Sequence, residues 1–100
     1  MIIYNVTIKI DLDVHDAWLR WMRDEHILRV LETGCFVSNK YYRVLEENTT
    51  DGITYAFQYS ANSMTDYFDY KANHADRLKN ESQALFPNKF TTFSTLLKEM

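Results

Sequence analysis

Hydrophobic and polar residues alternate at the start of the chain. In residues 2–10 every even position is apolar or aromatic, whereas the odd positions include Asn5, Thr7 and Lys9. A period of two, rich in β-branched residues, is typical of a half-buried strand. The same alternation returns in residues 53–61, so we expect a second strand of this kind there.

A helical period follows the first strand. Apolar residues within 14–22 are spaced three and four apart, which predicts an amphipathic helix. At 100° per residue, the apolar residues of 27–32 would point to the opposite side of that helix. We therefore expect a bend or break near His26, followed by a short helical turn with Gly34 as its C-cap residue.

The rest of the chain predicts a hairpin, a second helix and a last strand. Residues 35–46 are apolar on both faces and indicate a strand, and residues 46–52 end in Asp-Gly, a strong hairpin-turn signal. Ser63 is the expected N-cap of a helix with one apolar stripe, which Pro87 ends. Residues 90–97 indicate the last strand.

The predicted element order is β-α-β-β-α-β. This order is the ferredoxin-like pattern of the α+β class, with a four-stranded antiparallel sheet and two helices on one face. One hundred residues supply one core, so we expect residues 1–100 to form a single ferredoxin-like domain. Two glycines and one proline favour long regular elements over many tight turns.

Aromatic residues are more abundant than a small core requires. The chain has seven Tyr, six Phe and two Trp, and the central hairpin carries Tyr41, Tyr42, Tyr55, Phe57 and Tyr59. We expect these rings on the sheet face that the helices leave open, with Tyr41, Tyr55, Phe57 and Tyr59 as the interface residues. An open aromatic face of that size exceeds what a monomer exposes, so we expect a second copy to cover it through these residues. The expected assembly is a homodimer.

Charge and composition exclude several classes of binding partner. The net charge is -3 with mixed signs, which excludes the basic stripe that binds nucleic acid. No apolar run approaches the ~18 residues of a membrane-spanning helix, and residues 1–10 lack the features of a signal peptide. The single cysteine, Cys35, excludes an internal disulfide. These features predict a cytoplasmic protein that binds neither nucleic acid nor membrane.

His26 is the candidate catalytic residue. A neutral imidazole can take or give a proton near pH 7, and a helix break can aim the ring into a cleft. The alternative is structural, in which the ring hydrogen-bonds a carbonyl freed at the break or faces solvent.

Candidate ligand-binding residues lie on the first helix and the first strand. Trp18, Trp21 and Met22 could wall a pocket for a flat aromatic ligand, or they could be the stripe that packs this helix on its sheet. Polar side chains could orient such a ligand, or could face water or the dimer seam. These polar candidates are Asn5, Thr7, Ser38, Thr92 and Ser94.

The sequence predicts neither a metal site nor a cofactor. The run Asp11, Asp13, His15 and Asp16 lacks the glycine and the distal glutamate of a calcium loop, and helix capping accounts for Asp13 and Asp16. No histidine spacing matches a zinc motif, and composition does not say which histidine, if any, would bind haem. Cys35 is expected to pack in the core.

Several segments resemble an uncharacterised bacterial family of domains of unknown function. The resemblance spans nearly the whole chain but departs at Leu28, where that family tends to have proline. It implies the dimeric α+β barrel superfamily, which includes cofactor-free antibiotic-biosynthesis monooxygenases, haem-degrading enzymes, lactone isomerases and dye peroxidases. The segments that carry it are residues 1–7, 14–22, 25–27, 30–34, 52–55, 58–59, 89–90 and 95–97.

Two classes of function remain open at this stage. The first is a homodimeric small-molecule-binding protein that acts as a cofactor-free monooxygenase-like or isomerase-like enzyme in the cleft between sheet and helices. In that case His26 could deprotonate a flat, electron-rich substrate such as a polyphenol, which then reacts with oxygen. The second is a non-catalytic dimeric binding or structural module.

Overall fold

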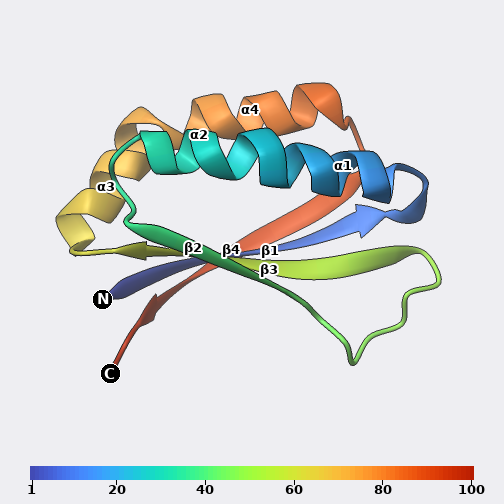
Figure 1. Ribbon diagram of the computed structural model, residues 1–100, viewed down its shortest axis with the longest axis horizontal. Coiled ribbons are helices and arrows are strands. Elements are labelled where there is room, and N and C mark those ends of the chain that lie inside the picture. Colours follow the sequence, from blue (N-terminus) through green and yellow to red (C-terminus); the bar gives the residue numbers. More distant parts are fainter.

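Four antiparallel strands form one sheet in the order β2-β3-β1-β4 (Figure 1). The computed structural model describes all of residues 1–100. Its strands are β1 (Ile2–Asp11), β2 (Ser38–Arg43), β3 (Gly52–Ala61) and β4 (Phe90–Lys98). All the helices lie on one face of this sheet, so the predicted ferredoxin-like α+β fold is confirmed.

The first helical segment changes phase without breaking. After a 3-10 turn, α1 (His15–Trp21) runs through a π-helical turn (Met22–His26) into α2 (Ile27–Glu32). The wider turn adds about one residue, which rotates the following side chains by about 100° and returns Ile27 to the core. The bend expected near His26 therefore takes the form of a π turn. Gly34 adopts a φ of 77°, the left-handed conformation of a C-cap.

The second helical segment is broken, contrary to the prediction of one helix. It consists of α3 (Met64–Asn73) and α4 (Ala75–Leu85), separated by His74 with φ -130° and ψ -33°. The expected N-cap is confirmed, because the Asp66 amide donates a 3.2 Å hydrogen bond to the Ser63 hydroxyl. No helix in the structure has the length and apolar character needed to cross a membrane.

The carboxylates before the first helix do not cap it. The N-cap position of α1 is Val14, and no side chain hydrogen-bonds to the helix end there. Asp13 instead accepts a 2.7 Å hydrogen bond from Lys89, and Asp16 accepts one from His15. The expected capping role of Asp13 and Asp16 is therefore wrong.

The register places the apolar positions of β1 and β3 on one face. Tyr4 lies opposite Tyr59 and Ile8 opposite Tyr55, so the even residues of β1 and the odd residues of β3 point to the same side. This side faces the helices and forms the core, in which Phe57 is completely buried.

The predicted placement of the hairpin aromatics is wrong except at Tyr42. Tyr55, Phe57 and Tyr59 are buried beneath the helices rather than exposed on the open face. Tyr41 lies on the same side at the sheet edge, and its ring stacks on Phe57 with centroids 5.4 Å apart. The helices cover the more apolar of the two sets of alternating side chains, because that arrangement removes the most apolar surface from water.

The open face of the sheet is mixed in character. Phe93, Leu97 and Tyr42 are its most exposed large side chains, and Phe93 is 66% exposed. Most of its other residues are small or polar. The small or polar residues are Asn5 and Thr7 of β1, Thr54, Ala56, Gln58 and Ser60 of β3, and Thr91 and Thr95 of β4, and Ile3 of β1 lies on the same face.

Candidate functional site

A cavity of about 260 Å³ lies between the sheet and the helices. Strands β1, β3 and β4 supply its floor, while the π turn, α2, α3 and α4 supply its walls. Twelve of its nineteen lining residues are hydrophobic, which is the usual character of a small-molecule site. The aromatic residues of the lining are Tyr4, Phe57, Tyr59, Tyr70, Phe90 and Phe93, of which Phe93 belongs by register to the open face of the edge strand β4.

Polar and charged residues, including Asp76, supply the rest of the lining. Ser82, Thr92 and Ser94 contribute hydroxyl groups to the lining. The exposed side chains of Lys71 and Lys79 also belong to the lining and mark its solvent side.

His26 lines the cavity and carries an unpartnered nitrogen. Its Nδ1 atom is buried and makes no hydrogen bond. The ring packs against Trp21, with centroids 4.9 Å apart. Burial lowers the pKa of His26 to about 4. Nearby Glu81 raises this pKa and Arg29 lowers it, and both effects are smaller than that of burial. The imidazole is therefore neutral at pH 7, and its Nδ1 atom is buried without a partner.

Tyr59 also lines the cavity and also carries a buried polar atom without a hydrogen bond. Its hydroxyl is buried without a hydrogen-bond partner, and burial raises its pKa. Leaving a buried polar group unpaired costs about 1–3 kcal/mol. His26 and Tyr59 are the only residues of the structure with such atoms, and both line the same cavity. This coincidence makes the cavity the candidate functional site.

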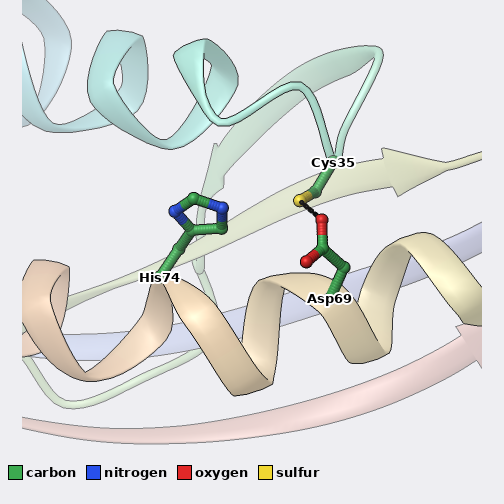
Figure 2. Close-up of side chains that lie close together, drawn as sticks. All are labelled: Cys35, Asp69 and His74. Atoms are coloured by element: carbon green, nitrogen blue, oxygen red, sulfur yellow. Dashed lines mark hydrogen bonds between the residues drawn. The ribbon is translucent and has the colours of Figure 1, made fainter.

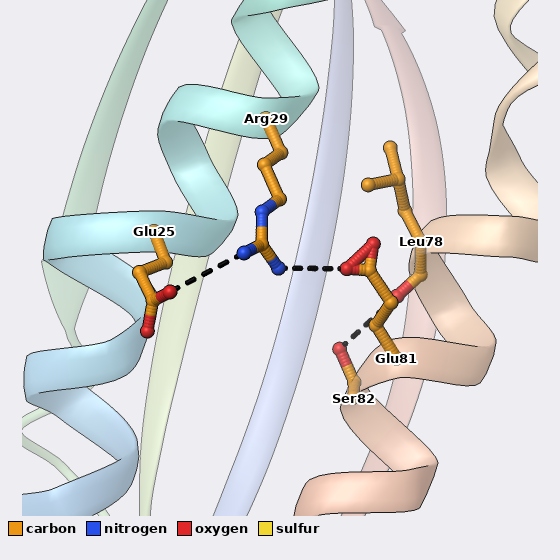
Figure 3. A network of polar contacts seen from close by, with 5 residues as sticks. All are labelled: Glu25, Arg29, Leu78, Glu81 and Ser82. Atoms are coloured by element: carbon orange, nitrogen blue, oxygen red, sulfur yellow. Dashed lines mark hydrogen bonds and ion pairs between the residues drawn. The ribbon is translucent and has the colours of Figure 1, made fainter.

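An ion-pair bridge joins the two helices α2 and α4 (Figure 3). Arg29 of α2 donates to Glu81 of α4 at 2.7 Å and to Glu25 at 3.3 Å. Ser82, which lines the cavity, lies next to Glu81 on α4 and hydrogen-bonds the Leu78 carbonyl. The bridge therefore links α2 to α4 next to a residue of the cavity lining.

Only some of the site residues predicted on the first helix line the cavity. His26 and Met22 line the cavity. Trp18 does not, because it is buried deeper against Phe57 in an edge-to-face contact. Trp21 does not line it either, and reaches it only through its contact with His26.

The predicted polar ligands of β1 lie on the other side of the sheet. Asn5 and Thr7 are on the open face, where the Asn5 amide donates a 3.2 Å hydrogen bond to the Thr7 hydroxyl. They cannot contact a ligand that lies beside His26. Thr92 and Ser94, which sequence patterning also favoured, do line the cavity.

Several cavity residues escaped sequence analysis. Tyr59 was assigned to the wrong face, and Tyr70 and Ser82 carried no sequence signal of a site. The pairing of odd β3 residues with even β1 residues would have placed Tyr59 correctly, but register is not legible in an isolated strand.

A group of possible metal ligands lies outside the cavity. Cys35, Asp69 and His74 offer donor atoms that all lie within 4.8 Å of one another. None of the three lines the cavity. Sequence spacing did not reveal this group, because Cys35 is 34 residues from Asp69 and belongs to another segment.

Solved structures with the same fold come from several proteins of low sequence identity. An antibiotic biosynthesis monooxygenase is 15% identical, with 100% of this chain and 99% of that chain covered and a TM-score of 0.64. A dimeric ferredoxin-like protein from an uncultured marine organism is 16% identical, with 99% and 96% covered and a TM-score of 0.62.

A third similar structure contains a ligand. It is a monooxygenase from the gene ActVA-Orf6 of Streptomyces coelicolor, in complex with nanaomycin D. It is 13% identical, with 99% of this chain and 88% of that chain covered and a TM-score of 0.62. At such identities these likenesses establish the fold alone.

The sequence itself identifies a family. None of the curated proteins matches the chain significantly. The family DUF4286, described as a domain of unknown function, has a sequence model that matches residues 1–100. The chain therefore belongs to the DUF4286 family.

Proposed function

We propose that this protein binds a small, flat, hydroxylated aromatic molecule in the cavity between sheet and helices. The observation that carries the proposal is the pair of unpartnered polar atoms, His26 Nδ1 and the Tyr59 hydroxyl, on residues of one aromatic cavity. With its proton on Nε2, the His26 ring accepts a hydrogen bond from a ligand hydroxyl. The Tyr59 hydroxyl can donate to a ligand oxygen.

The size and lining of the cavity define the ligand class. Its volume of about 260 Å³ is just below the range of about 300–1,000 Å³ typical of drug-sized pockets. One or two fused rings therefore fit. Aromatic walls favour a ring that can make stacked and edge-to-face contacts. The hydroxyls of Ser82, Thr92 and Ser94 offer further hydrogen bonds to ligand substituents.

The state of His26 favours binding over proton abstraction. Cofactor-free oxygenation or isomerisation would begin when a base removes a proton from the substrate. A group whose pKa is about 4 is a weak base at pH 7, although its neutral form is a good hydrogen-bond acceptor. The fold it shares with a monooxygenase that holds nanaomycin D supports a small-molecule role. We therefore propose binding as the function. Monooxygenase-like or isomerase-like activity would require a ligand whose binding raises the pKa of His26.

The proposal includes a homodimer that forms through the open sheet face. Phe93, Leu97 and Tyr42 supply exposed apolar surface there, and a second copy would bury it. The similarity to a dimeric ferredoxin-like protein supports this assembly. The unpaired Cys35 fits a reducing, cytoplasmic environment.

Calorimetric titration with 2-naphthol tests the ligand proposal. This probe has two flat rings and one hydroxyl group, so we expect saturable binding of one molecule per chain. Naphthalene, which lacks the hydroxyl, and decahydro-2-naphthol, which is not flat, should each bind at least tenfold more weakly. Tyr59→Phe and His26→Phe should each weaken 2-naphthol binding by about tenfold, the loss of one hydrogen bond of about 1.4 kcal/mol.

Tyr42→Phe is the matched control for this titration. It removes a hydroxyl from the open face, away from the cavity, and should leave the affinity unchanged. The proposal fails if 2-naphthol shows no saturable binding. It also fails if both cavity variants bind it as tightly as the wild type.

Sedimentation analysis tests the dimer. At micromolar concentration we expect twice the chain mass of 11.9 kDa. Phe93→Glu together with Leu97→Glu should yield a folded monomer, because paired like charges would be buried in the interface. Leu45→Glu, at an exposed position outside the sheet, is the control and should remain dimeric. A wild-type mass of 11.9 kDa would remove the dimer from the proposal.

A further inference from the structure

We propose that Cys35, Asp69 and His74 form a binding site for Zn²⁺, separate from the cavity. Figure 2 shows the three side chains converging between the loop after α2 and the end of α3. Their donor atoms all lie within 4.8 Å of one another, and the Cys35 sulfur is 3.3 Å from a carboxylate oxygen of Asp69.

Local backbone features bring these residues together. The left-handed Gly34 turns the chain out of α2 and delivers Cys35 to α3. Asp69 and His74 are five residues apart, so a continuous helix would place them about 140° apart around its axis. The break at His74 removes that separation and leaves the imidazole on the side of Asp69.

The donor set matches zinc chemistry. Thiolate, imidazole and carboxylate are the protein ligands of Zn²⁺, whereas Mg²⁺ and Ca²⁺ prefer oxygen ligands alone. Ligands at about 2.0 and 2.3 Å from a tetrahedral zinc ion are about 3.5 Å apart. The 3.3 Å between the Cys35 sulfur and Asp69 is close to that separation. Three protein ligands leave a fourth position open to water or to another molecule.

The geometry favours a metal site over a cysteine nucleophile. A nucleophilic cysteine needs an accessible thiolate, which a neighbouring base or positive charge stabilises. The Cys35 thiol is buried and donates its proton to Asp69, not to His74. In the zinc-bound form the metal ion would replace that proton between sulfur and carboxylate.

Neighbouring side chains influence the site in opposite directions. The Asn73 amide donates a 2.6 Å hydrogen bond to the second oxygen of Asp69, which orients the carboxylate. Arg77 lies 3.5 Å from Nδ1 of His74, at the limit of a hydrogen bond. This exposed cation opposes a metal ion at the imidazole and must move aside when the ion binds.

Titration of the reduced chain of residues 1–100 with Co²⁺ provides a direct test. Cobalt is a spectroscopic substitute for zinc, and a bound thiolate gives a charge-transfer absorption band. We expect one Co²⁺ per chain with this band, and its displacement by one equivalent of Zn²⁺. Cys35→Ser should abolish the band, while Asp69→Asn and His74→Gln should weaken binding by tenfold or more.

Two further variants sharpen the test. Arg77→Met should strengthen binding severalfold, because it removes the competing cation. His15→Gln changes a histidine outside the group and should bind Co²⁺ like the wild type. Circular dichroism checks that every variant is folded, and Asp69→Asn and His74→Gln carry the test if Cys35→Ser does not fold. The absence of a thiolate band, or unchanged binding in both of those variants, would overturn the proposal.

Discussion

The two faces of the sheet differ although the same strands form both. On the helix-covered face, Ile8 and Phe57 form a dense apolar and aromatic layer. On the open face, Asn5, Thr7 and Gln58 alternate with them along β1 and β3. The comparison shows that the abundance of aromatic residues serves the interior of the chain before it serves any interface.

The covered face is rich in aromatic rings and yet is not filled. The cavity of about 260 Å³ lies on this face, and both unpartnered polar atoms belong to its lining residues. A protein interior is normally close-packed and its polar groups are paired. The covered face therefore combines the core of the fold with the site that departs from ordinary core packing.

Truncation of one phenylalanine on each face should give the largest difference. Phe57→Ala should lower the free energy of unfolding by about 3–5 kcal/mol, because it leaves a cavity at a completely buried position. Phe93→Ala should lower it by no more than about 0.5 kcal/mol in the monomer, because the ring is mostly exposed. Urea unfolding at low protein concentration measures both. Equal losses would contradict the assignment of faces.

Acidification should destabilise the covered face through His26. Its folded-state pKa of about 4 lies below the ordinary value of 6.5, so between these values the unfolded state binds the proton more readily. The neutral His26 therefore contributes to the free energy of unfolding in full above pH 6.5. This contribution, on the order of 3 kcal/mol, is lost as the pH falls toward 4.

His26→Gln is the reference for this pH dependence. The variant lacks the titrating imidazole, while all the carboxyl groups remain. The difference in unfolding free energy between wild type and variant should therefore shrink as the pH falls from 6.5 to 4. Parallel stability curves over that window would rule out a buried, neutral His26.

Removal of the Tyr59 hydroxyl should stabilise the empty protein. The hydroxyl is buried without a partner, so Tyr59→Phe should raise the unfolding free energy by about 1 kcal/mol. Tyr42→Phe on the open face should change it by less than about 0.5 kcal/mol. Thermal and urea unfolding provide the comparison. A loss of stability in Tyr59→Phe would mean that the hydroxyl already has a partner.

The smallest effect is expected from the bridge between the helices. Arg29 and Glu81 are both partly exposed, so their pair gains little over water, and Glu81→Gln should cost about 0.5 kcal/mol. Added salt should reduce the difference from wild type. Glu25→Gln, at the longer contact with Arg29, should cost less still. A loss of several kcal/mol would show that the bridge stabilises the covered face more than a surface ion pair does.

Sequence analysis predicted the order of elements better than their faces. Alternation in β1 and β3 and the Asp-Gly turn determine the strands locally. The phase change after Trp21 predicted a distortion near His26, and the π turn is that distortion. The break at His74 was missed, because neither glycine nor proline marks it.

The candidate site depends on contacts between distant residues and was therefore only partly predictable. His26 was selected because its neighbours change helical phase, and this local signal survives in the structure. Tyr59 depends on strand register and on which face the helices cover. The group of Cys35, Asp69 and His74 depends on how the α2–β2 loop meets α3. Neither arrangement is encoded in spacing along the chain.

The most direct test of the central claim is the nitrogen NMR spectrum of the His26 side chain with and without 2-naphthol. The claim is that the Nδ1 atom, unpartnered in the empty protein, accepts its hydrogen bond from the ligand. The Nδ1 resonance should shift saturably with 2-naphthol and remain unshifted with naphthalene. An Nδ1 resonance that stays fixed while 2-naphthol binds would contradict the claim.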